Sequence, residues 1–362
     1  TREFSPMIDE FAGNDEPLDD VNEDDIDEDV VYSVNSFGAD FLVDGLISRL
    51  QSGDIFRPSF QRQFVWTIPQ ASKFIESILL GLPIPGIFLY REESTRKHLI
   101  IDGLQRLTTI AAFASGKFPE SDRVFRLDKL KSKFNGRALD DLDQADNRRF
   151  FDTAIHATII QQLAPENDSS SVYYIFERLN TGGTPLQPQE IRAALYHGAF
   201  QDFIIELNNN ELWRKVFGPK NKRGKDLELI LRFFAFRYAS EPYKAPMKAF
   251  LNRFMALNRE LEKESPKVME KDFIDALSFI TGAVGEKPFR PVRSLNAAAF
   301  DSVTVVVSKN IRQLREMGNA AFLAHYNALM KDASFLRLVT RSTADDQSVK
   351  ERFSAAEKHL LA

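Results

Sequence analysis

The stretch from His98 to Thr109, HLIIDGLQRLTT, has residue types and spacing suited to binding an anion. Its apolar start predicts a strand, Asp102-Gly103 predicts a tight turn, and the residues that follow predict a helix. The first amides of a helix lack intrahelical partners and lie at the positive end of its dipole, so they can bind a phosphate. Gly103 permits close backbone approach, and Arg106 adds a cation with paired donors. Asp102 could hold a metal ion or orient a water molecule.

Two other segments carry polar residues in a similarly ordered way. The segment Phe60–Trp66 (FQRQFVW) lies just before a predicted helix and contains a Gln-Arg pair. The segment Phe176–Leu186 (FERLNTGGTPL) predicts the end of a helix followed by a glycine-rich turn, and Gln189–Arg192 (QEIR) comes soon after it. Each motif alone is weak, but several in a fixed order are far more specific.

Together these motifs resemble the N-terminal domain family of GmrSD-type restriction proteins, the type IV, modified-DNA-dependent class with a ParB/sulfiredoxin-like domain. Members carry a Gln-Arg with a nearby Val-Trp, an Asp-Gly-Gln-Gln-Arg box, and an Arg-Leu-Asn-Thr-Gly-Gly segment leading into Gln-Glu-Ile-Arg. Two later stretches, DLELILRFF at 226–234 and FLNRFM at 250–255, are similar to its helical part. The resemblance covers nearly the whole chain after residue 35.

The resemblance implies an α+β fold in three parts. We expect an acidic disordered tail at residues 1–30, a ParB/sulfiredoxin-like, nucleotide-binding mixed domain at 31–165, and a largely α-helical domain at 166–362 that completes the pocket. The tail holds 13 of the 52 acidic residues and a single arginine, a composition that cannot offset the entropy of ordering a backbone. It is either a solubilising tail, which is the simpler interpretation, or a DNA mimic that covers the basic body.

By resemblance, the pocket would hold a nucleoside triphosphate (GTP, CTP or ATP), with Mg²⁺ as a candidate metal and Asp102 as its candidate ligand. Arg106 and Arg62 would contact phosphate, Gln61 and Gln105 would position polar groups, and the Asn180–Gly183 turn would close the pocket. The candidate catalytic residues are Asp102, Gln105 and Arg106. The candidate nucleotide-binding residues are Gln61, Arg62, Gly103, Asn180, Thr181, Gly182 and Arg192.

One position departs from the family pattern. The box reads Asp-Gly-Leu-Gln-Arg, so Leu104 replaces an amide that could touch the nucleotide or its water. Because the outer elements of the box are intact, nucleotide binding is better supported than hydrolysis.

Three hypotheses on function follow. The first is a nucleotide-binding, NTP-hydrolysing component of a modified-DNA restriction or anti-phage defence system, with DNA as a partner and cleavage by a separate nuclease. The second is a non-catalytic DNA-binding or regulatory module with a degenerate ParB-like pocket, which Leu104 favours. The third, direct DNA cutting with a metal on Asp102, is the weakest because few carboxylates lie near the box. The five histidines are scattered and none begins an HNH-type pair, so we expect the nuclease half to be missing.

The amino-acid composition excludes several kinds of protein and of active site. With no cysteine, the chain has no disulfide, thiolate nucleophile or Cys-ligated metal. No apolar run approaches the roughly 20 residues of a membrane span, and the acidic N-terminus does not resemble a signal peptide, so a cytoplasmic location is expected. The net charge is -5, but after residue 30 there are 46 basic and 39 acidic residues. The resulting formal charge of +7 is compatible with DNA binding.

The apolar spacing predicts the elements around these motifs. Phe41, Leu42, Leu46, Ile47 and Leu50 indicate one helix ending at Gly53, and Pro69 begins another that ends at Gly81. The predicted strands are 86–90, 99–101 and 155–163. The remaining predicted helices are 105–114, 172–179, 189–197, 200–208, 227–238, 248–263, 273–279, 297–316, 320–331 and 349–361.

Two groups of side chains leave alternatives open. Phe60, Phe64 and Trp66 could stack on a base, although core packing is favoured because a chain with 31 Phe must bury most of its aromatic residues. The densest basic stretch runs from Arg214 to Lys225 and could be a DNA-phosphate patch or a solvated loop.

Overall fold

The computed structural model describes residues 33–57, 64–92, 95–119, 121, 123–164, 170–179, 187–221, 223–291 and 294–362. By its internal contacts the chain divides into two compact units. One comprises residues 29–197 and is called the mixed unit; the other contains residues 198–362 and is called the helical unit. The expected acidic tail lies outside the described residues.

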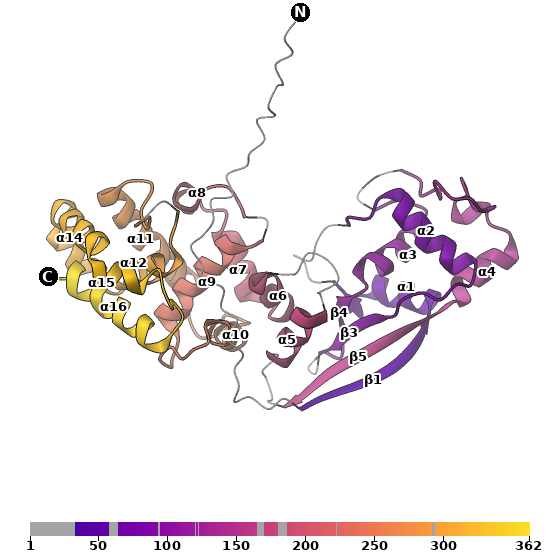
Figure 1. The fold of residues 1–362 in the computed structure, drawn as a ribbon, viewed down its shortest axis with the longest axis horizontal. Coiled ribbons are helices and arrows are strands. Elements are labelled where there is room, and N and C mark those ends of the chain that lie inside the picture. Colours follow the sequence, from indigo (N-terminus) through magenta and orange to yellow (C-terminus); the bar gives the residue numbers. More distant parts are fainter. Residues whose placement is uncertain are drawn as a thin grey trace, which may run out of the picture. The chain divides into compact units, whose positions relative to one another are not determined.

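The mixed unit contains a five-stranded sheet with the strand order β1-β5-β3-β4-β2 (Figure 1). β3 lies at its centre, antiparallel to β4 and parallel to β5, while β1 is antiparallel to β5 and β2 is parallel to β4. The strands are β1 (Ser33–Leu42), β2 (Ile55–Phe56), β3 (Ile87–Arg91), β4 (His98–Asp102) and β5 (Ala154–Ala164). The three strands expected from the sequence are therefore confirmed, and the first two of them, β3 and β4, pair with each other.

The expectation of a helix around Phe41 and Leu42 is wrong. These residues end β1, and the helix α1 begins only at Val43. The helical spacing of these apolar residues spans a junction between a strand and a helix. β1 pairs along its whole length with β5, and this non-local pairing outweighs the local spacing.

Six α-helices of the mixed unit are described. They are α1 (Val43–Ser52), α2 (Ile68–Leu79), α3 (Leu104–Ser115), α4 (Gln144–Asp152), α5 (Ser170–Leu179) and α6 (Pro188–Leu195), with a 3-10 turn, η1, at Leu139–Asp141. Apolar side chains of α1 to α4 share one buried core with strand residues such as Leu89, Ile100 and Ile159. α5 packs against β4 and against α6. The long loop between α3 and α4 is anchored in the core by Phe125, whose ring meets that of Phe113 edge-on at 5.4 Å.

The helical unit is built around α12 (Ala297–Lys309), in which every residue from Ala297 to Ser308 is buried. α9 (Lys225–Tyr238), α11 (Pro266–Val284) and α16 (Asp346–Leu360) pack against it. The other described helices are α7 (Ala199–Leu207), α8 (Glu211–Phe217), α10 (Met247–Leu257), α13 (Ile311–Met317), α14 (Asn319–Lys331) and α15 (Ala333–Leu338). Phe233 and Phe273, with ring centroids 5.0 Å apart, belong to a large aromatic core.

Most of the predicted helices are confirmed, with differences at their ends. The span 297–316 is two helices, because α12 ends at Lys309 and α13 begins at Ile311, with Asn310 between them. α10 ends at Leu257 rather than reaching Lys263. The short helices α4, α8 and α15 were not expected, and their burial comes from neighbouring elements rather than from a long apolar stripe of their own.

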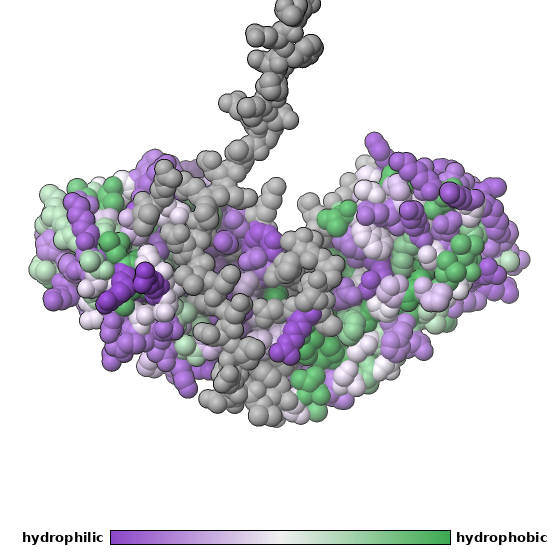
Figure 2. Space-filling view, in the orientation of Figure 1, coloured by the Kyte–Doolittle hydropathy of each residue, from purple (hydrophilic) through white to green (hydrophobic). Residues whose placement is uncertain are grey.

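The mixed α+β class is confirmed. Sequence patterning places the change to helical structure after residue 165, where the last strand ends. The compact units divide between residues 197 and 198, since α5 packs against β4 and α6 packs against α5. Among the described helices, none is both long and apolar enough to cross a membrane. Hydrophobic side chains gather along β1 and β5 in Figure 2, and there Val34, Phe37 and Leu163 are exposed.

Candidate functional site

The turn between β4 and α3 has the strand–turn–helix geometry expected from the sequence. Gly103 occupies the N-cap position of α3 with φ 99°, a left-handed conformation that L side chains rarely adopt. A Cβ at this position would lie 2.5 Å from Cγ2 of Ile87 on the neighbouring strand. Glycine is therefore required at position 103 both by the backbone conformation and by the lack of room for a Cβ atom.

The N-terminus of α3 has no side-chain cap. Gly103 offers no side chain, whereas the N-cap residues of α4 and α8, Asp143 and Asn210, accept hydrogen bonds from the first turns of their helices. The carbonyl of Gly103 accepts from the amide of Leu107 at 2.9 Å, so the helix is regular from its first turn. The amides that precede Leu107 have no intrahelical acceptor, and they form the positive end of a 12-residue helix.

Arg106 lies in that first turn and is held by two acceptors. Its Nη2 donates to Oδ2 of Asp102 at 2.7 Å and to the carbonyl of Gly86 at 2.9 Å. The Arg106 side chain is 17% exposed, and that of Asp102 is 44% exposed. Nε of Arg106 is buried and has no hydrogen-bond partner among the described residues. The guanidinium is thus fixed at the helix start with donor capacity remaining.

Gly86 is a site residue that the sequence did not reveal. A Cβ here would lie 2.8 Å from the carbonyl oxygen of His156, so only glycine lets this backbone run so close to β5. The carbonyl of Gly86 in turn anchors Arg106, which is 20 residues further along the chain. A glycine just before a strand was the only available signal, and it is common in turns.

Gln105 acts through the backbone of the segment before α2. Its Oε1 accepts from the amide of Val65 at 3.0 Å and from that of Trp66 at 3.3 Å. This segment follows the Gln61-Arg62 pair in the sequence, so Gln105 ties the β4–α3 turn to the residues that come directly after that pair.

Phe64 and Trp66 of this segment pack into the protein, as favoured from the sequence, whereas Phe60 lies outside the described residues. The ring of Trp66 meets Phe74 edge-on at 5.6 Å, and that of Phe64 meets Phe118 at 5.4 Å. Both side chains are partly buried against the core of the mixed unit. Their rings thus serve as structural support for the segment that Gln105 holds.

Leu104, the departure from the family box, is half-buried and packs against the same core. It is the first residue of α3, and its side chain adds no polar group to the helix start. At this position the start of α3 therefore has an apolar side chain packed against the core, where the family pattern has a polar one.

The metal candidate, Asp102, brings one carboxylate to the site. Within the described ranges, no group of three or more His, Asp or Glu side chains is arranged to hold a metal ion. Mg²⁺ at nucleotide sites is bound by one or two carboxylates together with phosphate oxygens and water, so a single carboxylate fits a metal that arrives with its nucleotide.

Of the other residues predicted to bind the nucleotide, the structure describes Arg192. Arg192 lies in α6, is 1% exposed, and donates from Nη1 to Oε1 of Gln189 at 3.1 Å. Gln189 itself is buried, so this pair lies in the interior of the mixed unit. Gln61, Arg62 and the turn residues Asn180, Thr181 and Gly182 lie outside the described residues.

The basic stretch from Arg214 to Lys225 is partly structural. Nη1 of Arg214 donates to Asp226 at 2.9 Å and Nη2 to Asn208 at 2.7 Å. Burial lowers the pKa of Arg214, and the charge of Asp226 opposes that shift. Arg214 therefore belongs to an internal network and does not contribute to a surface patch.

The fold and this site define an α+β domain in which an uncapped helix start and an arginine follow the strand β4, next to the central strand of the sheet. Residues 43–197 match the model of the GmrSD restriction endonuclease N-terminal domain, so this part of the chain is similar to that domain. No curated protein matches the chain. A solved Pnob8-like ParB-N domain aligns over 91% of this chain and 99% of its own length, with 11% identity and a TM-score of 0.22.

Proposed function

We propose that the mixed unit binds a nucleoside triphosphate at the start of α3, as a component of a DNA restriction or anti-phage defence system that acts with a separate nuclease. The observation that carries the proposal is the glycine-capped start of α3 with Arg106 held in its first turn by Asp102 and Gly86. The match of residues 43–197 to a restriction endonuclease N-terminal domain supports the link to restriction of DNA.

The chemistry follows from the charges at the turn. Phosphate oxygens would accept from the free amides at the start of α3 and from the unused donors of Arg106. Asp102 would repel a phosphate by itself, but it is paired with Arg106 at 2.7 Å and more exposed than its partner. It is therefore suited to bind the Mg²⁺ that accompanies a triphosphate, and the metal would neutralise phosphate charge there.

A second candidate function is binding without turnover, in a regulatory module. Leu104 favours it, because the side chain packs against the core and adds no polar group that could orient an attacking water. Binding and hydrolysis are therefore tested separately.

The binding test is calorimetric titration of the whole chain with GTP, CTP, ATP and UTP, with and without Mg²⁺. We expect one triphosphate to bind, and Arg106→Gln to weaken it by about tenfold or more, because a hydrogen bond to a charged group is worth about 1.5–3 kcal/mol. Arg148→Gln, at an exposed arginine of α4, is the control. If no triphosphate binds, or if a folded Arg106→Gln variant binds as the parent does, the proposal is wrong.

Phosphate release distinguishes the two candidates. Leu104→Gln restores the family box, and we expect it to raise the rate of hydrolysis while leaving nucleotide affinity within a few-fold. An unaltered parent that already hydrolyses the triphosphate would exclude the regulatory module. The DNA partner is tested by binding to modified and unmodified duplexes over a salt series, since phosphate-only contact produces a steep salt dependence and no preference.

A further inference from the structure

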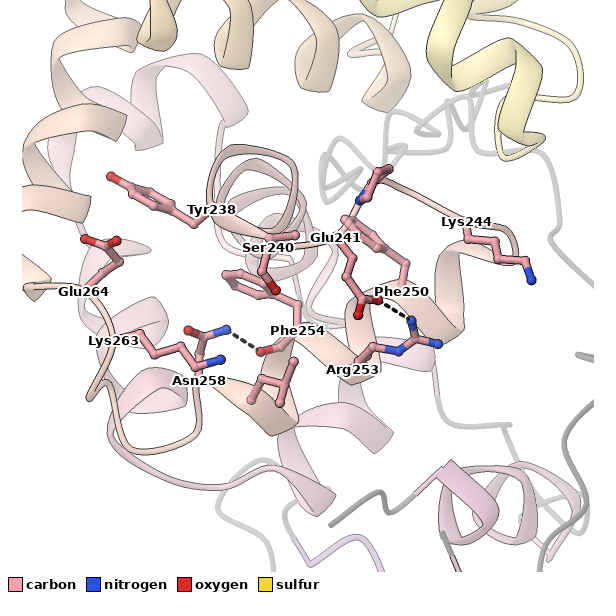
Figure 3. Close-up of a pocket in the computed structure, with 13 residues that line it drawn as sticks. Tyr238, Ser240, Glu241, Lys244, Phe250, Arg253, Phe254, Asn258, Lys263 and Glu264 are labelled. Carbon is pink, nitrogen blue, oxygen red and sulfur yellow. Dashed lines mark hydrogen bonds and ion pairs between the residues drawn. The ribbon is translucent and has the colours of Figure 1, made fainter. Parts of the chain in front are cut away.

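The helical unit contains a cavity of about 250 Å³ that no sequence motif indicated (Figure 3). It lies between the C-terminal end of α9, the loop that follows, α10, and the loop after α10. The lining residues that matter here are Tyr238, Ser240, Phe254, Leu257, Asn258 and Lys263. The volume is just below the range of about 300–1,000 Å³ for ligand pockets, so a molecule with a single ring suits it.

The apolar wall of the cavity is held in place from behind. Phe254 is 4% exposed, and its ring meets Phe200 edge-on at 5.6 Å. Leu257, one turn further along α10, is 52% exposed, so a large apolar side chain lies at the surface of the cavity. A fixed aromatic ring beside an accessible aliphatic side chain is a surface on which a ring can pack without prior rearrangement.

Tyr238 keeps its hydroxyl turned to the protein. The phenol donates to Oδ2 of Asp272 at 2.7 Å. Burial, followed by this hydrogen bond and the charge of Asp272, raises the pKa of Tyr238 well above its ordinary value of 10. The residue therefore remains neutral at physiological pH and adds no negative charge to the cavity.

Five charged side chains line the cavity, and one of them, Glu264, lies near enough to Tyr238 for its charge to help raise the pKa of that phenol. Arg253 is paired with Glu241 at 3.2 Å. In Figure 3, Lys244 extends away from the other labelled side chains, whereas Lys263 extends toward Asn258. No carboxylate in the described part of the chain forms an ion pair with Lys263. Its ammonium is thus the group available to a negatively charged ligand.

We propose that this cavity binds a small aromatic anion: one ring with a carboxylate or a phosphate group. The ring would pack against Phe254 and Leu257, the anionic group would bind to Lys263, and Ser240 and Asn258 would supply neutral hydrogen bonds. The inference does not rest on the proposed function, because every lining residue belongs to the helical unit and the triphosphate site belongs to the mixed unit.

The test is the binding of four probes to the full chain, measured by saturation-transfer NMR and by calorimetry. Benzoate and phenyl phosphate carry both features and separate the carboxylate source from the phosphate source. Benzyl alcohol lacks the charge, and acetate lacks the ring. We expect at least one of the first two to bind about tenfold or more tightly than either of the last two, as expected for loss of one charged hydrogen bond or one packed ring.

Two variants in the cavity and one control outside it locate the site. Lys263→Met keeps the aliphatic stem and should weaken the aromatic anion about tenfold or more, whereas Lys331→Met, at an exposed lysine of α14, should leave it unchanged. Leu257→Asp changes an exposed residue and should abolish binding by placing a negative charge on the wall. The proposal is overturned if neither aromatic anion binds, if both bind no better than benzyl alcohol, or if Lys263→Met binds as the parent does.

Discussion

Asp301 is the residue on which the charge balance of the helical core depends. Nε and Nη2 of Arg232 donate to its Oδ2 at 3.0 and 2.7 Å, and Nη2 of Arg352 lies 3.4 Å from the same oxygen. All three side chains are 2% exposed or less. Arg352 also donates to the carbonyl of Thr343. Two buried cations thus share one buried carboxylate.

Asp301→Asn should destabilise the protein by about 3–5 kcal/mol, because it removes the buried carboxylate that both buried guanidinium groups contact. The free energy of unfolding in urea measures the effect. Glu316→Gln is the matched control: its pair with Arg312, at 3.7 Å, has side chains 94% and 73% exposed, so the change should cost no more than about 1 kcal/mol. Equal losses in the two variants would contradict this account.

His98 makes the mixed unit sensitive to acid. Burial lowers its pKa below the ordinary value of 6.5, and the charges of Arg49 and Arg91 lower it further. The unfolded chain therefore binds a proton at higher pH than the folded protein does. The stability associated with neutral His98 is fully present above pH 6.5 and is lost as the pH falls from 6.5 toward the lowered value.

His98→Gln removes this titration. Its free energy of unfolding should fall less than that of the parent between about pH 7.5 and about pH 5.5, when each protein is unfolded in urea at both values. A variant whose stability falls as much as the parent's would show that His98 does not titrate differently on folding.

At the scale of elements, α3 has a left-handed glycine at each end, and the two differ in their surroundings. Gly103 has φ 99° and lies against Ile87, whereas Gly116 has φ 77° and a Cβ there would meet nothing within 4 Å. Replacing each glycine with alanine therefore tests backbone strain alone at Gly116 and backbone strain together with a steric clash at Gly103.

Gly116→Ala should cost about 1 kcal/mol from strain alone, and Gly103→Ala should cost more, about 2–4 kcal/mol, because strain and the close contact with Ile87 add. Denaturant unfolding of both variants provides the comparison. Since Gly103→Ala also displaces the start of α3, it should weaken any triphosphate bound there, while Gly116→Ala should not. Equal costs would mean that the contact with Ile87 relaxes freely.

On the scale of the whole molecule, the two compact units have separate cores, one on the sheet and one around α12. We expect calorimetric unfolding to resolve two transitions, because each core can be lost by itself. Gly103→Ala should lower one of them and Asp301→Asn the other. A single transition shifted by both variants would show that the units unfold as one.

Many of the secondary-structure elements of this protein can be predicted from its sequence alone. The strand, glycine turn and helix around Asp102 and Arg106 depend on residues within a dozen positions of one another, so apolar spacing and one glycine were enough to predict them. The α+β class and most helices follow for the same reason.

The tertiary structure decided what each of these residues contacts. Arg106 is anchored by a carbonyl 20 residues away, Gln105 holds the backbone 39 and 40 residues before it, and Arg232 meets Asp301 across 69 residues. β1 is a strand because β5 lies beside it. Local spacing cannot encode such partners, because they depend on strand register and on which helix faces pack together.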